Sequence, residues 1–113
     1  MIETLVNGTW HPAVTPQPAG SPGPFGGFLA WVACPAPGSC VTVGGYYTHT
    51  GPAADASQPQ IDTPAGGIWT ATPGALPADA GTKDQIGALY DVACTQTGNC
   101  VSMGIYAAGA NTR

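Results

Sequence analysis

The sequence contains very little charge. Of its 113 residues only 7% are Asp, Glu, Lys or Arg, and Lys83 and Arg113 are the only strong bases. A surface that binds nucleic acid needs clustered basic side chains to neutralise phosphates, and a surface that binds anionic lipid needs the same. With a formal net charge of −4, the chain is not expected to bind nucleic acid or to act at a membrane surface.

Long apolar runs and helix signals are also missing. No stretch approaches the roughly eighteen apolar residues of a spanning helix, so we expect no membrane span. The first residues, Met1 to Thr4, lack the basic and apolar segments of a leader, which predicts a removed leader, another export route, or a piece of a longer protein. Seventeen Gly and twelve Pro leave little room for helices. We therefore expect a single all-β domain over residues 1–113.

The four cysteines occur in two identical C-x5-C spacings, Cys34 to Cys40 and Cys94 to Cys100. Each pair encloses turn residues with a Gly at the same place, so the two cysteines can meet across a hairpin. We expect the local pairs Cys34–Cys40 and Cys94–Cys100, out of three possible connectivities. The alternative is a zinc site, although zinc pairs favour shorter spacings. Local disulfides predict an oxidising compartment, hence a secreted or cell-surface protein.

An internal repeat of about sixty residues is the strongest pattern in the chain. Ile2-Glu3-Thr4 aligns with Ile61-Asp62-Thr63, and Trp10 aligns with Trp69. Further on, the cysteines, two glycines and a tyrosine recur in the same order at an offset of sixty. We divide the chain into repeat 1, residues 2–60, and repeat 2, residues 61–113.

Each unit reads as four short strands punctuated by Gly and Pro. The expected strands of the complete unit are Phe28 to Cys34, Cys40 to Tyr47, Gln60 to Pro64 and Ile68 to Pro73. The turn Asn7-Gly8 favours a tight hairpin, because both central residues must reach positive φ. The chain opens on the last two strands of a unit and closes on the first two of another. This phase predicts one complete propeller-type blade and two half-blades with open edges.

The string Val-Ala-Cys-x5-Cys-Val-x-Val/Met-Gly-x-Tyr, followed by Asn-Gly-Thr-Trp or Gly-Gly-Ile-Trp, resembles disulfide-containing tandem repeats of exported actinobacterial proteins. This resemblance implies propeller-type four-stranded antiparallel blades, and it covers most of the chain apart from residues 11–27 and 48–59. Gly8-Thr9-Trp10 is also similar to the Asp-box of sialidase-type propellers. The turn Asp of that box is absent here, which weakens any inference to sialidase activity.

Four residues are candidates for ligand contact. Trp31 and Asp91 occupy equivalent places in the two units, and a Trp present in one copy only is less typical of packing. Tyr47 and Tyr106 lie at strand ends, where an aromatic ring with a polar tip suits a binding surface. Packing is the alternative for each of them, and for the recurring Trp10 and Trp69, for which sugar stacking is the second possibility.

Catalytic and metal patterns are weak. The two histidines, His11 and His49, have no nucleophile at an informative spacing, and we expect solvated loop positions. Glycoside cleavage needs two facing carboxyls and a calcium loop needs several close oxygen ligands. The carboxylates are too scattered for either: Glu3, Asp55, Asp62, Asp79, Asp84 and Asp91. We therefore predict no catalytic residues, no metal and no cofactor.

Three functions remain open. The first is a non-enzymatic, lectin-like extracellular module that binds a glycan or another surface polymer and closes into a ring with further copies. The second is a structural subunit, a scaffold or filament, of the cell surface. The third is a fragment of a larger secreted hydrolase propeller. The first two predict a homo-oligomer formed through open strand edges.

Overall fold

A computed structural model of the chain describes residues 1–19, 26–48, 56–81 and 85–108. Within these ranges all regular structure is antiparallel β-sheet and none is helix, which confirms the predicted all-β class. Several residues of the sequence predictions lie outside the described ranges: His49, Asp55, Lys83, Asp84 and Arg113.

The strands fall into three sheets along the chain. An N-terminal hairpin is formed by β1 (Ile2–Val6) and β2 (Thr9–Ala13). A central sheet follows in the order β3 (Gly27–Ala33), β4 (Val41–Tyr47), β5 (Ser57–Ala65) and β6 (Ile68–Pro73). A C-terminal hairpin consists of β7 (Gly87–Gln96) and β8 (Asn99–Tyr106).

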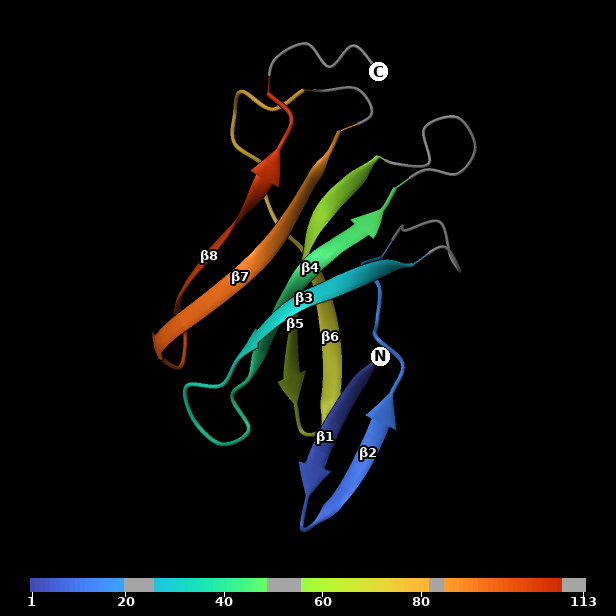
Figure 1. Cartoon of the computed structure of the whole chain (residues 1–113), viewed down its shortest axis with the longest axis vertical. Helices are drawn as coiled ribbons and strands as arrows, with labels where there is room; N and C mark the ends of the chain where they lie inside the picture. Colours follow the sequence, from blue (N-terminus) through green and yellow to red (C-terminus); the bar gives the residue numbers. More distant parts are fainter. Residues whose placement is uncertain (20–25, 49–55, 82–84, 109–113) are drawn as a thin grey trace.

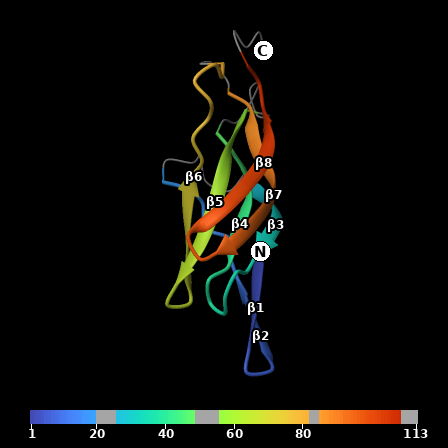
Figure 2. The same ribbon diagram turned by 90° about the vertical axis from the view of Figure 1, so that its left-hand side faces the viewer.

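The C-terminal hairpin packs on one face of the central sheet, whereas the N-terminal hairpin projects from it (Figure 1). Strand β7 contacts β3, β4 and β5, but the N-terminal hairpin makes only marginal contacts with the other strands. The view from the side shows the N-terminal hairpin extending beyond the central sheet (Figure 2). The described strands do not close into a propeller.

The two equivalent hairpin turns have the same backbone geometry. Asn7 and Gly8 have φ of 51° and 80°, and Gly66 and Gly67 have φ of 59° and 84°. Two consecutive residues with positive φ define the type I′ turn, whose twist matches that of the flanking strands. The structure therefore confirms the tight hairpin predicted from Asn7-Gly8.

Both cysteine pairs close locally, as predicted. Cys34 is bonded to Cys40 and Cys94 to Cys100, with a Cα–Cα distance of 4.0 Å in each pair. No cysteine is left as a thiol, so the alternative of a four-cysteine zinc site is wrong. The second disulfide joins residues directly opposite each other on β7 and β8.

The first strand of each unit carries a β-bulge at the same place. The register shifts between Leu29 and Trp31 in β3 and between Leu89 and Asp91 in β7. Beside each bulge the neighbouring strand supplies a glycine, Gly44 in β4 and Gly104 in β8. A Cβ at Gly44 would overlap the carbonyl oxygen of Phe28, and one at Gly104 would overlap that of Ala88. This close approach explains why the two glycines recur in the repeat.

Strand β5 begins earlier than the sequence predicted. The predicted strand begins at Gln60, but the observed strand starts at Ser57 and pairs there with Tyr47. The Ser57 hydroxyl donates a hydrogen bond to the carbonyl oxygen of Gly87 at 3.1 Å. This contact to the C-terminal hairpin orders residues that have few strand-forming side chains of their own.

The core lies between the central sheet and β7. A Cβ at Gly45 would come within 3.2 Å of the Ala88 side chain, so the two layers are in close contact. The rings of Phe28 and Tyr90 stack with their centroids 5.9 Å apart. Val43 and Val92 are buried as well. We call this side of the central sheet, with Phe28, Val43 and Gly45, the β7 face.

The Gly44→Ala substitution tests the close approach at the bulge. Because the new methyl group meets backbone that cannot move alone, we expect the free energy of unfolding to fall by about 2–3 kcal/mol. Urea unfolding followed by tryptophan fluorescence measures the change. The neighbouring Gly45→Ala variant is the control, since its methyl group would come no closer than 3.2 Å to the Ala88 and Phe28 side chains and needs only a small shift. Equal losses for the two variants would contradict the backbone explanation.

Candidate functional site

The predicted ligand residues Trp31 and Asp91 lie in the middle of strands. Trp31 is on β3 and Asp91 on β7, each directly after the bulge, and both side chains are exposed. The Trp31 side chain is 57% exposed, although β3 packs against β7. A tryptophan that keeps this much surface in water is available for stacking on a ligand.

The predicted tyrosines lie elsewhere, at the ends of β4 and β8, both at the upper end of Figure 1. The hydroxyl of Tyr106 donates a hydrogen bond to Asp79 Oδ1 at 2.8 Å, and this contact raises the pKa of the phenol. Tyr47 is half-buried, and its backbone N–H donates to the carbonyl oxygen of Gly26. The two tyrosines thus lie at strand ends, whereas Trp31 and Asp91 lie in the middle of their strands.

Polar side chains gather near these strand ends. The Tyr46 hydroxyl donates to Gln58 Oε1 at 3.1 Å, and Gln58 Nε2 donates to Gln85 Oε1 at 3.0 Å. Gln58 and Gln85 also line a shallow hollow of about 450 Å³ beside residues 73–80. Neither glutamine could be recognised from the sequence, because isolated Gln residues in Pro-rich and Gly-rich segments carry no motif.

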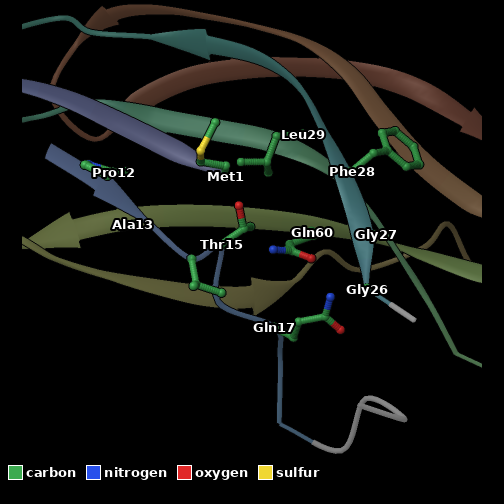
Figure 3. A pocket seen from close by; sticks show the side chains of 11 residues that line it. Met1, Pro12, Ala13, Thr15, Gln17, Gly26, Gly27, Phe28, Leu29 and Gln60 are labelled. Carbon is green, nitrogen blue, oxygen red and sulfur yellow. The ribbon is translucent and has the colours of Figure 1, made fainter. Parts of the chain in front are cut away.

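A larger hollow of about 770 Å³ lies on the opposite face of the central sheet from β7. Figure 3 shows Met1 and Leu29 on one side of it and Thr15 and Gln60 on another. The other lining residues come from the end of β2, the segment after it, and the start of β3. We call this side of the sheet, with Leu29, Gly44 and Gln60, the linker face, because residues 14–18 cross it.

Buried polar side chains anchor this crossing segment. Gln60 and Asp62 point to the same face of β5 and are both almost completely buried. Gln60 Nε2 donates to the carbonyl oxygen of Pro16 at 2.8 Å and to Asp62 Oδ1 at 2.8 Å. Both hydrogens of the Gln60 side-chain amide are thereby used. The carboxyl of Asp62 holds this amide in the orientation that binds Pro16. Burial raises the pKa of Asp62, against the lowering effect of the hydrogen bond from Gln60 and of the positively charged amino terminus.

Potential metal ligands do not gather in the described part of the chain. Within the described ranges, no three His, Cys, Asp or Glu side chains lie close enough to hold a metal ion. Asp62 has no second carboxyl beside it in its hydrogen-bond network, whose donor is an amide. His11 is exposed as expected, but it lies on strand β2 and not in a loop as predicted. Residues 1–19, 26–48, 56–81 and 85–108 contain no helix that could cross a membrane.

The chain has no match among the known proteins compared with it. No family model matches the sequence, and neither the curated proteins nor the solved structures give a match. Function must therefore be argued from the residues themselves.

The Asp62→Asn substitution tests the buried carboxyl. Because burial raises its folded-state pKa above the unfolded value of about 3.9, the folded state holds the proton more tightly. The contribution of Asp62 to stability is then fully present below that value and is lost as pH rises through the folded-state pKa. We expect Asp62→Asn to raise the free energy of unfolding more at about pH 7 than at about pH 3.

Urea unfolding at the two pH values measures this difference. The exposed Glu3→Gln variant at the equivalent place in β1 is the control, and we expect it to change stability by less than about 0.5 kcal/mol. An Asp62→Asn variant that is equally destabilised at both pH values would show that the hydrogen bond to Gln60, and not the burial of charge, dominates.

Proposed function

We propose that the chain is a non-enzymatic module of the extracellular space or cell surface that associates with further copies of itself through its incomplete units. One observation carries this proposal. Val43 in the complete unit is 1% exposed, whereas its equivalent Met103 in the C-terminal hairpin is 64% exposed. The same position is thus part of the core in one unit and faces water in the other.

Further residues support self-association. Val101, Met103 and Ile105 alternate along β8 and form a continuous exposed apolar row. Within the described part of the chain, β8 pairs with β7 alone, so its outer edge has free backbone donors and acceptors. An exposed apolar row beside an open strand edge is the arrangement that promotes strand addition. The low charge offers little repulsion between copies.

Two disulfides support an oxidising location for such a module. In this proposal each unit is a propeller-type blade, and copies join into a ring or, if the contacts do not close, into a filament.

The Met103→Glu substitution tests self-association. Because the association would bury this side chain, a carboxylate there must lose its hydration, and we expect at least about tenfold weaker association. Native mass by light scattering over a range of concentrations measures it. Ile68→Glu is the matched control, since Ile68 is an equally exposed apolar residue at the turn of the complete unit. A wild-type monomer at every concentration would refute the proposal.

Trp31 favours a second candidate function, which is binding of a glycan. Its side chain is exposed although its neighbours on β3 contact β7, and the second unit has Asp91 in its place. A flat aromatic surface beside polar groups suits the apolar faces of sugar rings. Assembly would present one such tryptophan per copy, which provides the multivalency that lectins use.

The Trp31→Ala substitution tests glycan binding. We expect soluble cello- or chito-oligosaccharides to raise the melting temperature of the wild-type protein, and Trp31→Ala to weaken binding at least about tenfold. Trp10→Ala is the control, because Trp10 is also exposed but lies on the projecting hairpin. A response that survives in Trp31→Ala and disappears in Trp10→Ala would move the site to β2.

A further inference from the structure

The N-terminal and C-terminal hairpins are complementary halves of one unit. The alignment makes β7 and β8 equivalent to β3 and β4, and makes β1 and β2 equivalent to β5 and β6. A C-terminal hairpin joined to an N-terminal hairpin would therefore reproduce the strand order of the central sheet. Within one chain this joining does not occur, because the structure keeps β1–β2 and β7–β8 as separate two-stranded sheets.

We propose that β8 of one copy pairs antiparallel with β1 of a second copy, with Met103 opposite Ile2. This inference rests on the proposed self-association and specifies its geometry. The central sheet supplies the register, because Val43 lies opposite Ile61 and Gly44 opposite Gln60. Transferred by the repeat, these pairs become Met103 with Ile2 and Gly104 with Met1.

The hollow on the linker face is where this pairing would place the incoming strand. Met1 and Leu29 both line the hollow, and Met1 is the residue that would face Gly104 of the other copy. Figure 3 shows the Met1 side chain directed toward Leu29, between the start of β1 and the central sheet. The space is largely apolar on this side, which suits the apolar row of β8.

Exposed faces on both partners support the same arrangement. Val92 on β7 is 4% exposed, because the C-terminal hairpin packs on the central sheet. Its equivalent on β3, Val32, is 53% exposed. The row of Val101, Met103 and Ile105 is the equivalent of the β7 face. Each of the two surfaces that meet inside the chain thus recurs once with exposed apolar residues. On the linker face, residues 14–18 cover the side of Gln60 but leave Val32 exposed.

These two exposed apolar surfaces complement each other in the same way as the two that are paired. The central sheet of the second copy would lie on the C-terminal hairpin of the first as that hairpin lies on its own central sheet. In this arrangement the same rotation relates each unit to the next, both within a chain and between copies. It brings about the pairing of β8 with β1 and the packing of the two faces together. A contact of this head-to-tail kind leaves one free surface at each end until the ring closes.

Engineered disulfides test the register. All native cysteines are already paired, so the double variant Ile2→Cys with Met103→Cys adds the only thiols. Oxidation is expected to give covalent dimers and larger species on a non-reducing denaturing gel. Glu3→Cys with Met103→Cys, one residue out of register, is the matched control and should cross-link at least about fivefold less, because neighbouring strand residues point to opposite faces.

A second pair guards against loss of folding at the buried Ile2. Thr4→Cys with Val101→Cys continues the same register by two residues, and both side chains are exposed. Covalent oligomers from both in-register pairs would support the inference. Equal cross-linking of in-register and shifted pairs, or monomers closed on themselves, would overturn it. If the wild-type protein associates but neither pair cross-links, only the register is wrong; if it never associates, the proposed function fails as well.

Discussion

The contact between β7 and the central sheet is the interaction on which the rest of the described structure depends. It is the place where two layers meet, and residues small enough for close approach, Gly45 and Ala88, lie at its centre. It buries Val43 and Val92 and orders the start of β5 through Ser57. A single sheet leaves both faces in water and cannot form a core alone, so the second layer is what gives the complete unit an interior.

The opposite face is organised by polar groups instead. Gln60 uses both amide hydrogens to join Asp62 to the carbonyl of Pro16, so the segment after β2 is fixed to the sheet by hydrogen bonds. Such a connection specifies one position of the segment, because a shift would leave a buried carboxyl and amide without partners. The apolar hollow next to this segment is not filled by any such hydrogen-bonded group. This part of the linker face is therefore packed less completely than the β7 face.

Local chemistry made much of this fold predictable. The cysteine spacing gave both disulfides, Asn7-Gly8 gave the type I′ turn, and the repeat predicted the equivalence of the units. The sequence did not reveal that β5 begins at Ser57, because the order there comes from contact with Gly87 rather than from the strand's own residues. Gln60 and Asp62 were also missed as a pair, since their partner Pro16 is 44 residues from Gln60 along the chain.

The difference between equivalent residues argues for completion by a partner rather than for a tolerant surface. If β8 had evolved to face water, the residues of its exposed face would be expected to be polar, as on antiparallel sheets with one solvated face. Val101, Met103 and Ile105 instead keep the apolar character of Val41 and Val43, and Ile105 stands where the central sheet has Gly45. Gly45 is tight against Ala88, whereas Ile105 carries a large side chain at the equivalent place, so a second copy could not approach β8 as closely. The two contacts are therefore equivalent in position but not in packing, and the junction between copies can differ in strength from the junction within the chain.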